Sequence, residues 1–365
     1  MSESVWVLGA TGRTGAAIAT RLGVRGIVPV LVGRDEDRLR AVAEPLGATV
    51  VIATNPAAMA AAIRRERPGT VVNTVGPFLE TAELVVDACL AAGSDYLDLA
   101  NDMGAVPALL ERRADAVRAG CTLVTGAGFG VAATESVVVR LCEGMPPAAK
   151  VRTDMIPSIA VEDGVVGQAL AATLLEGLPG VPGGGRFQGR RIVAGRLVPA
   201  GIGSRPVPLT TPDGESVVTG LVPLGELAAA QRASGAIDAE AASAEAPSGV
   251  LRTLFPVATV LLRLGPLRRA LIRRVASVKT AARPRPREHS WAHARIEWAD
   301  GVAREGWLRL GDASDATANF AAETAARLAA GLGRPGAFTP AALFGPGLAE
   351  ACGGHYVACT PRSEA

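Results

Sequence analysis

The chain has 365 residues, a length that predicts two domains or one large one and excludes a short peptide or a disulfide-stapled miniprotein. With 49% hydrophobic and 20% charged residues, the composition is typical of a soluble globular protein. A formal net charge of +2 and only thirteen aromatic residues disfavour nucleic-acid binding, which needs excess positive charge and stacking platforms. We therefore expect no nucleic-acid partner.

The five cysteines stand in apolar runs and form no C-x-x-C pair, so we expect buried thiols in a reducing compartment and no metal site. The start of the chain shows no basic stretch followed by a long apolar core, and we expect no signal peptide. The apolar run 254–262 is far shorter than the roughly 20 residues that cross a membrane. These features predict a cytoplasmic protein.

A glycine-rich turn near the start of the chain carries the strongest signal. A strand is predicted over 5–8 and a helix over 16–22, and the segment between them is Gly9-Ala10-Thr11-Gly12-Arg13-Thr14-Gly15. In a dinucleotide-binding turn, Gly9 permits the sharp bend, Gly12 lets a pyrophosphate approach the backbone, and Gly15 lets helix and strand pack closely. We therefore predict that this segment binds the phosphates of a dinucleotide.

A regular alternation of apolar strands and amphipathic helices follows. Strands are predicted at 28–32, 48–53, 70–75, 95–99 and 122–125, with helices at 36–45, 56–66, 80–92 and 105–119 between them. Uninterrupted apolar strands between helices are typical of a parallel sheet covered on both faces. The sequence therefore predicts an α/β fold whose first domain, residues 1–130, is a Rossmann-type doubly wound parallel sheet that binds its ligand at the carboxyl ends of the strands.

The end of the second strand bears on which nicotinamide cofactor is bound. Gly33 leaves room beside the ribose 2′ position. Arg34 would bind a 2′-phosphate, which gives NADP, whereas Asp35 would accept a hydrogen bond from a free 2′-hydroxyl, which gives NAD. Because Arg13 in the turn adds a second cation, we favour NADP(H). In the alternative interpretation, Arg34 and Asp35 only form the solvated start of a helix.

The fourth strand ends in Asn73-Thr74-Val75-Gly76-Pro77-Phe78. Gly76 permits close approach of a ligand, and Pro77 stiffens the turn. We expect Val75, Gly76 and Pro77 to bind the nicotinamide half of the cofactor, with an ordinary strand-ending turn as the alternative.

Several segments share a pattern with a known family. They read GATGRTG at 9–15, VGRD at 32–35, NTVGPF at 73–78, AGSDYLDL at 92–99, GAGFG at 126–130 and GAFTP at 336–340. On these segments the chain resembles the saccharopine dehydrogenase-like oxidoreductases, which include saccharopine reductases and the trans-acting enoyl reductases of actinobacterial lipid biosynthesis. The resemblance implies an NADP-binding domain, an inserted mixed α/β domain that carries the substrate, and a C-terminal return to the first domain.

Two segments depart from the family pattern. Ala100-Asn101-Asp102 stands where the family usually reads Thr-Gly-Glu, and residues 128–135 read GFGVAATE where it often has Gly-Phe-Asp-Ser-x-Pro-Ser-Asp. Both segments are expected to line the substrate cleft, so the departures bear on the substrate more than on the cofactor. The only lysines, Lys150 and Lys279, disfavour a Schiff-base mechanism.

In the second half of the chain the predicted strands alternate polar and apolar residues, at 151–156, 191–198, 206–210, 217–222, 289–298 and 303–310. The alternation predicts an inserted α+β substrate domain, residues 131–317, with a mixed or antiparallel sheet. Helices are predicted at 165–175 and 251–276, and loops at 178–189 and 199–212. We expect the segment 228–249, rich in alanine, serine and glutamate, to be a mobile loop. Helices at 318–332 and 339–351 form a C-terminal part, 318–365, which by the resemblance returns to the first domain.

Three residues are candidates for donating a proton to the substrate. In the strand 289–298, alternation places His293 on one face with Trp291 and Arg295. Tyr96 and Asp102 lie at the end of a predicted Rossmann strand. A purely structural role is the alternative for each.

The basic segment 250–287 is a local feature that the net charge hides, because residues 250–295 carry eleven arginines and lysines against one glutamate. Interleaved apolar residues predict an amphipathic helix that Pro256 and Pro266 break or kink. Three interpretations remain open: a solvated face over a core helix, a docking site for an acidic carrier protein or a carrier-linked substrate, and contact with an anionic membrane.

The sequence as a whole predicts an NADPH-dependent reductase that delivers hydride to a C=C or C=N bond of a lipid or specialised-metabolite intermediate. Its substrate would be a small molecule, free or linked to a carrier. The alternative is a catalytically silent NADP-binding sensor or assembly partner. The oligomeric state stays open, a homodimer included.

Overall fold

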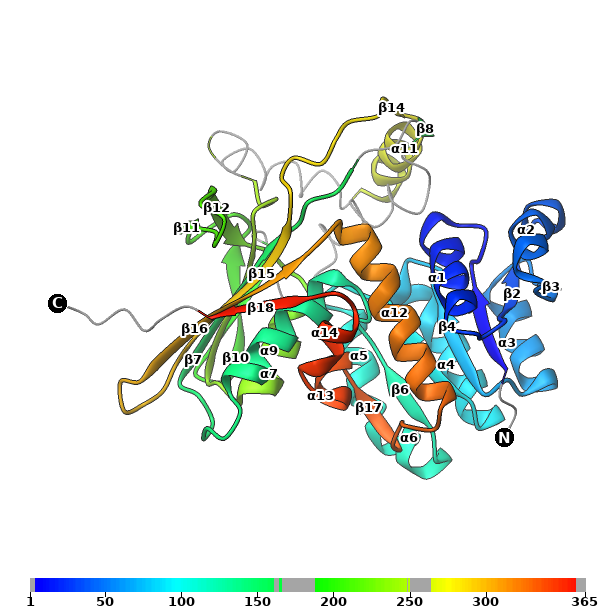
Figure 1. The fold of residues 1–365 in the computed structure, drawn as a ribbon, viewed down its shortest axis with the longest axis horizontal. Coiled ribbons are helices and arrows are strands. Elements are labelled where there is room, and N and C mark those ends of the chain that lie inside the picture. The colour runs from blue at the N-terminus through cyan, green and yellow to red at the C-terminus, as the bar shows by residue number, and fades with distance from the viewer. Residues whose placement is uncertain (1–3, 161–163, 166–187, 248, 250–263, 359–365) are drawn as a thin grey trace. The chain divides into compact units, whose positions relative to one another are not determined.

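The structure is a computed structural model, and it describes residues 4–160, 164–165, 188–247, 249 and 264–358. The chain divides into two compact units (Figure 1). Unit 1 comprises residues 1–100, 105–132 and 314–344, and unit 2 comprises 101–104, 133–313 and 345–365. Of the predicted helix 165–175 only Val165 is described, and it belongs to the strand β8; residues 166–175, and the predicted loop 178–189 up to residue 187, lie outside the described residues. The division into residues 1–130, 131–317 and 318–365 according to their roles in cofactor and substrate binding stays a prediction.

Unit 1 is built on a seven-stranded parallel sheet with the strand order β17-β6-β5-β4-β1-β2-β3. The strands are β1 Val5–Leu8, β2 Val30–Gly33, β3 Val50–Ile52, β4 Thr70–Asn73, β5 Asp95–Asp98, β6 Thr122–Val124 and β17 Gly336–Phe338. This order confirms the doubly wound α/β prediction. From β1 the chain first adds β2 and β3 on one side and then β4, β5 and β6 on the other, so the order of strands reverses between β1 and β4. In such sheets ligands bind outside the carboxyl ends of the strands at that reversal.

Helices flank this sheet. They are α1 Arg13–Val24, α2 Glu36–Ala43, the short η1 Glu44–Leu46, α3 Pro56–Glu66, α4 Phe78–Ala92, α5 Ala105–Glu111, α6 Arg113–Ala119, α12 Ala313–Ala329 and α13 Pro340–Phe344. Helix α12 returns to α1, where Arg21 Nε donates to Asn319 Oδ1 at 2.7 Å. The turn η2 Phe129–Ala133 leads out of the unit.

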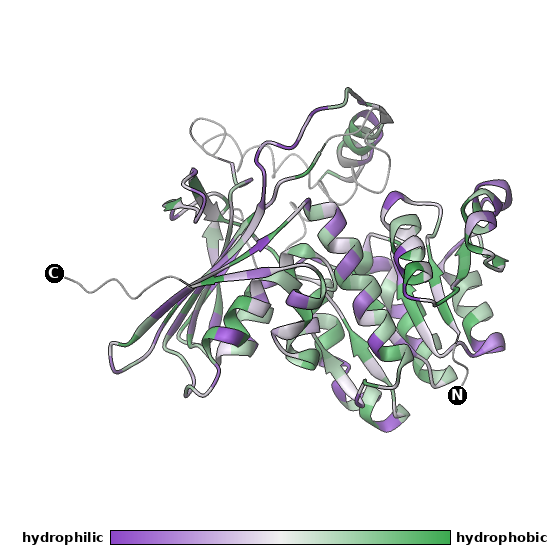
Figure 2. Cartoon of the chain, in the orientation of Figure 1, coloured by the Kyte–Doolittle hydropathy of each residue, from purple (hydrophilic) through white to green (hydrophobic). Residues whose placement is uncertain are grey.

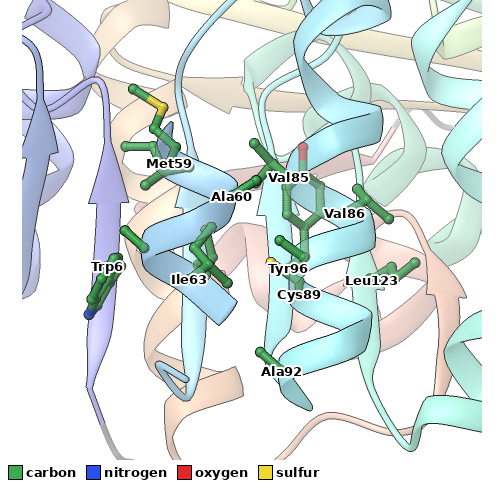
Figure 3. Packing of buried hydrophobic residues seen from close by; sticks show 14 of the residues in the cluster. Trp6, Met59, Ala60, Ile63, Val85, Val86, Cys89, Ala92, Tyr96 and Leu123 are labelled. Carbon is green, nitrogen blue, oxygen red and sulfur yellow. The ribbon is translucent and has the colours of Figure 1, made fainter. Parts of the chain in front are cut away.

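Each face of the sheet has its own apolar core because successive side chains point in opposite directions. Trp6, Ile63, Cys89, Tyr96 and Leu123 belong to one core, which Figure 3 shows from close by. The residues that alternate with these along the strands, such as Val7 and Leu97, pack against α1, α2 and α12 in the other core. Burial on both faces explains why β1 and β2 read as continuous apolar runs, VWVL and VLVG, and Figure 2 shows much of this sheet in green.

Unit 2 contains a nine-stranded mixed sheet along the path β10-β9-β13-β7-β15-β16-β18, to which the hairpin β11–β12 is added. The strands are β7 Lys150–Ile156, β9 Gln188–Val193, β10 Arg196–Gly201, β11 Val207–Thr210, β12 Ser216–Leu221, β13 Asp238–Ser243, β15 Ser290–Glu297, β16 Ala303–Leu310 and β18 His355–Ala358. The pair β13–β7 is parallel and the other pairs are antiparallel. The prediction of a mixed sheet is confirmed. A separate two-stranded sheet joins β8 Gly164–Val165 to β14 Lys279–Thr280.

The helices of unit 2 are α7 Thr134–Leu141, α9 Glu226–Ser234, α11 Gly265–Ala276 and α14 Gly347–Ala351. Helices α7 and α9 pack against the large sheet. A Cβ atom on Gly306 would lie 3.2 Å from Leu141 Cδ2, which shows how closely α7 approaches β16. The residues that alternate with Gly306, including Trp307 and its cross-strand partner His293, therefore lie on the opposite face.

The structure corrects the prediction of a mobile loop at 228–249. Most of that segment forms the helix α9 and the strand β13, and β13 lies inside the sheet with partners on both edges. The alanines that make the segment look low in complexity are its buried side: Ala229, Ala230, Ala239, Ala241 and Ala242 are nearly inaccessible. Small side chains lose no rotamer freedom on burial, so an alanine-rich stretch packs well.

Three further boundaries differ from the predictions, two of them because glycine or proline breaks a predicted element. The predicted strand 191–198 is a hairpin, since Ala194 and Gly195 with positive φ turn the chain between β9 and β10. The predicted helix 339–351 is two helices, α13 and α14, separated by Gly345 and Pro346. The predicted loop 199–212 contains the end of β10, and it also contains β11, which matches the strand predicted at 206–210. Of the helix predicted at 251–276, only α11 lies within the described residues, and none of the described helices is long and apolar enough to cross a membrane.

Candidate functional site

The glycine turn of unit 1 leaves no room for side chains at two of its glycines. Gly9 has φ +76°, and a Cβ atom there would lie 2.7 Å from Thr74 Oγ1 at the end of β4. A Cβ atom on Gly15 would lie 2.5 Å from the Gly9 carbonyl oxygen. The turn closes with the Gly12 N–H, which donates to Gly9 O at 2.9 Å. The first helix and the end of β1 are therefore packed as closely as backbones allow.

The start of α1 has the character of an anion site. Its N-cap is Gly12 in an extended conformation, with φ −76° and ψ 155°, so no side-chain oxygen caps the helix. Its first turn holds no acidic residue, and Arg13 is exposed at the first helical position. Backbone N–H groups at a helix N-terminus, together with the helix dipole, favour a phosphate. A backbone cradle that excludes a Cβ atom, at an uncapped helix start, fits a pyrophosphate.

The end of β4 is fixed by hydrogen bonds around the predicted nicotinamide turn. Asn73 is buried, and its Oδ1 accepts from the Val75 N–H at 3.0 Å. Thr74 Oγ1 donates to the Leu8 carbonyl at 2.7 Å, which ties β4 to β1. Thr81 Oγ1 lies 2.5 Å from the carbonyl of Val75 and 3.0 Å from that of Pro77. The backbone from Val75 to Pro77 is therefore held from both sides.

Of the residues after β2, Asp35 has a structural role, and Arg34 and Arg38 are exposed and available to a ligand. Asp35 caps α2, since its Oδ1 accepts from the Arg38 N–H at 3.1 Å. Arg34 is exposed. Arg38, which the sequence analysis did not single out, is also exposed and reaches back toward the turn, with Nη2 3.5 Å from the Thr11 carbonyl oxygen. The sequence signal that could have found it is a second arginine in the first turns of the helix that follows Arg34 and Asp35.

Gly33 differs from the glycines of the turn. A Cβ atom there would lie 3.4 Å from Leu39 Cδ2, an ordinary contact distance. The fold therefore does not require glycine at this position.

Tyr96 lies in the interior of unit 1. Its hydroxyl donates to Asp98 Oδ2 at 3.0 Å and accepts from Asn73 Nδ2 at 3.1 Å. Asp98 Oδ1 accepts from Thr125 Oγ1 at 2.8 Å and from the Ala100 N–H at 3.1 Å. Burial raises the pKa of Asp98 to about 6 and raises that of Tyr96 well above its ordinary value. The sequence analysis missed Asp98, which joins the carboxyl ends of β5 and β6.

Asp102 lies in unit 2 beside an acid that sequence reasoning missed. Asp102 forms a backbone bridge to Leu224, and its Oδ1 accepts from the Gly104 N–H at 2.9 Å. One residue earlier, the Asn101 amide, with its nitrogen turned toward Glu226, donates to both carboxylate oxygens, at 2.9 and 3.2 Å. Burial raises the pKa of Glu226 to about 7. No motif marks Glu226, because its burial depends on the fold.

His293 is enclosed in unit 2 between two carboxylates. Its Nδ1 lies 2.9 Å from Asp154 Oδ2 and its Nε2 lies 3.0 Å from Glu305 Oε1. Burial opposes protonation of the ring, but the hydrogen bonds and negative charges of the two carboxylates outweigh it and raise the pKa of His293. The ring also stacks at a tilt against Trp307, with centroids 4.3 Å apart. Among its polar neighbours, Asp154 further accepts from Thr219 Oγ1 at 2.6 Å.

The comparisons with known proteins agree with this geometry. The model of the saccharopine dehydrogenase NADP-binding domain matches residues 5–124. Among solved structures, apo saccharopine dehydrogenase (L-Glu forming) from Saccharomyces cerevisiae is similar, with a TM-score of 0.62, 12% identity, and coverage of 98% of this chain and 100% of that one. At this identity the likeness shows the fold.

A weaker likeness is to a probable dehydrogenase from Thermotoga maritima, with a TM-score of 0.44, 12% identity, and coverage of 95% of this chain and 94% of that one. Another is to GenD2 from gentamicin A biosynthesis in complex with NAD, with a TM-score of 0.42, 15% identity, and coverage of 98% of this chain and 97% of that one. No curated protein matches the chain by sequence.

Proposed function

We propose that this chain, a saccharopine dehydrogenase-like NADP-dependent oxidoreductase, is a reductase that acts on a C=C or C=N bond of a lipid or specialised-metabolite intermediate. The observation that carries the proposal is the backbone cradle of Gly9 and Gly15 at the uncapped start of α1. Such a cradle excludes side chains where a pyrophosphate needs backbone N–H groups. NADPH supplies the hydride when it is bound.

The residues of unit 1 divide the work of holding this cofactor. The backbone of the turn, from Gly9 to Gly15, binds the pyrophosphate. Arg34 binds the 2′-phosphate, and the exposed Arg38 of α2, which reaches toward the Thr11 carbonyl, adds a second cation there. The segment from Val75 to Pro77, held by Asn73 and Thr81, positions the nicotinamide. Positioning of this kind lowers the barrier without any covalent step by the protein.

The proton that accompanies hydride transfer needs an acid. We propose Glu226 for this role, ahead of His293, Asp102 and Tyr96, because a carboxyl with a pKa of about 7 is half protonated near neutral pH. Asn101, its amide partner, stands in the segment that departs from the family pattern. Tyr96 is the weakest of the four candidates, since burial raises its pKa well above its ordinary value and its single hydroxyl proton is already donated to Asp98.

The basic segment supports a proposal about partners. Within the described part of it, α11 exposes Leu267, and the adjoining Leu264 and Val278 are also exposed. Arg273 and Arg274 are exposed on the same helix. We propose that this surface docks an acidic carrier that presents the substrate, while the protein itself is cytoplasmic.

The test of this docking surface compares two partners. We expect an acidic carrier protein to pull the chain down and anionic liposomes not to bind it. Co-sedimentation with anionic liposomes alone would indicate membrane contact instead, and light scattering would tell a homodimer from a monomer.

The test of the function is consumption of NADPH, followed by its absorbance, against a panel of enoyl, imine and carbonyl compounds, each free and carrier-linked. We expect turnover with members of the enoyl or imine classes and none with NADPH alone. Saturable NADPH binding without turnover across the panel would favour the silent sensor or assembly partner. Turnover with carbonyl compounds only would place the reaction in another class.

A further inference from the structure

Unit 2 contains a pocket of about 320 Å³ that none of the roles above uses. It is formed by β7, β9, β13 and β15, with Arg205 from the connection after β10. Five cationic side chains line it, those of Lys150, Arg152, Arg191, Arg205 and Arg295. Three carboxylates also line it, those of Asp238, Glu240 and Glu297. The side chains in the wall therefore carry a net charge of +2.

Three of these arginines converge on the single carboxylate of Glu240. Arg205 Nε lies 2.5 Å from Glu240 Oε1, and Arg191 Nη1 lies 3.6 Å from the same oxygen. Arg152 Nη1 lies 3.1 Å from Oε2. Arg205 adopts φ +51°, a left-handed conformation that non-glycine residues rarely take. The backbone thus accepts a disfavoured conformation where this side chain turns to the cluster.

The other acids do not remove the surplus of positive charge. Glu297 is shared by Arg295 at 3.2 Å and Lys150 at 3.8 Å, and Asp238 accepts from the Ala194 N–H at 2.8 Å. Behind the wall, Asp154 pairs with Arg152 at 3.0 Å, but it is shared with His293. Each carboxylate therefore already has its partners.

Donors for a further anion remain on the arginines. A guanidinium has five N–H groups. Within the described residues, Arg191 Nη1 contacts Glu240 Oε1 at 3.6 Å, a distance longer than a hydrogen bond, so this ion pair does not use the N–H donors of Arg191 fully. The side chains of Arg191 and Arg205 are 34% and 56% exposed, so a solute reaches them from solvent.

We propose that this pocket binds a phosphate dianion, either free or as the phosphate group of a small molecule. Guanidinium groups match the geometry of phosphate with paired N–H donors. A dianion would neutralise the net charge of the wall. The volume lies at the lower end of the range of about 300 to 1,000 Å³ for small-molecule sites, which suits a small ligand.

The test is calorimetric titration with inorganic phosphate, at constant ionic strength, of protein already saturated with NADP⁺. Saturation with the cofactor keeps phosphate away from the glycine turn. If the proposed function fails and NADP⁺ does not bind, phosphate in the pocket is still recognised, because substitution of Arg191 and Arg205 weakens it and Gly15→Ala does not. A parallel titration with glycerol phosphate distinguishes the two sources: tighter binding of the ester indicates a phosphorylated small molecule, and equal or weaker binding indicates free phosphate. We expect saturable binding at millimolar concentration.

Two variants move the affinity in opposite directions. Arg191→Gln together with Arg205→Gln should weaken phosphate binding by at least about tenfold, because charge-assisted hydrogen bonds are lost. Glu240→Gln should strengthen binding several-fold, since it removes the anion that competes for the arginines. A merely structural role of the cluster would not produce that increase. Arg196→Gln, an exposed arginine on β10 outside the pocket, is the matched control and should change nothing.

Thermal unfolding of each variant shows whether it is folded before it is titrated. Absence of saturable phosphate binding to the wild-type protein would overturn the proposal. So would equal weakening by Arg196→Gln and by the double variant, because binding would then reflect overall charge.

Discussion

Tyr96 donates its hydroxyl proton to Asp98 at 3.0 Å while it accepts from Asn73 at 3.1 Å, and all three side chains are buried in the sheet of unit 1. This chain of hydrogen bonds crosses from β4 to β5. Through Thr125 and the Ala100 N–H, Asp98 extends it to the ends of β5 and β6. Tyr96 therefore fixes the strand ends that carry the cofactor turn and the segment after β5.

Tyr96→Phe tests whether this residue is structural. The variant leaves Asn73 Nδ2 and Asp98 Oδ2 without their buried partner, and an unpaired buried polar group costs about 1 to 3 kcal/mol. We expect the free energy of unfolding, measured with denaturant, to fall by that amount, with kcat little changed. A large loss of kcat with unchanged stability would instead support Tyr96 as the proton donor.

The glycine turn is tested by a pair of alanine substitutions. Gly15→Ala places a Cβ atom 2.5 Å from the Gly9 carbonyl oxygen, so the backbone must move, and we expect NADPH affinity to fall by more than about tenfold. Gly311→Ala, in unit 2, meets no atom within 4 Å and should leave both the NADPH affinity and the melting temperature nearly unchanged. Fluorescence titration with NADPH measures the affinity of both variants. Equal effects of the two substitutions would contradict the steric argument.

The preference for NADPH over NADH depends in our proposal on Arg34 and Arg38. Each substitution by glutamine should reduce NADPH affinity by about tenfold, since one charge-assisted contact to the 2′-phosphate is lost, and should leave NADH affinity unchanged. Arg40→Gln is the control, because Arg40 is an exposed arginine of α2 that pairs with Glu36. The ratio of kcat/KM for the two cofactors is the measurement. An unchanged ratio in Arg34→Gln would show that this arginine only begins the helix.

His293 offers a test of the buried network in unit 2. Glu305→Gln removes one of the two carboxylates that raise the pKa of His293, so the pKa should fall. A raised histidine pKa contributes stability that is present at low pH and is lost as the pH rises through the pKa of the folded state. The variant should therefore lose stability mainly on the acidic side. NMR titration of the ring protons is practicable because the chain has three histidines, and Glu297→Gln, on the same strand, is the control.

The sequence predicts unit 1 much better than unit 2, and the reason is physical. Strands buried on both faces are largely apolar, so β1, which reads VWVL, and β2, which reads VLVG, are visible in the sequence. The strand β17 was missed because three residues, Gly336–Phe338, are too few to show a period. In unit 2, β13 reads as alanine-rich filler, and only its pairing with β7 and β9 makes it a strand.

The candidate site follows the same division. Backbone requirements, such as those at Gly9 and Gly15, leave a mark in the sequence because only glycine meets them. The environments of Asp98 and Glu226 come from residues distant in the chain, such as Thr125 and Asn101, and no local pattern records them.

Glu226→Gln separates the catalytic from the structural consequences of a buried acid. Burial raises the pKa of Glu226 from 4.5 to about 7, so the folded state binds a proton more tightly than the unfolded one. The contribution of Glu226 to wild-type stability is therefore greatest below pH 4.5, falls as the pH rises toward 7, and stays reduced above it. Since one pKa unit corresponds to about 1.4 kcal/mol, the glutamine variant should be more stable than the wild type by up to about 3 kcal/mol at alkaline pH.

If Glu226 donates the proton, kcat of the wild type should decline above pH 7 as the acid ionises. The glutamine variant should then lose kcat by at least about a hundredfold, and the remaining rate should not show this decline. Glu288→Gln, at a side chain that is 81% exposed, is the control and should affect neither property. A variant that gains stability and keeps full kcat would show that Glu226 is a buried acid without a part in the reaction, and proton donation would then pass to His293 or Asp102.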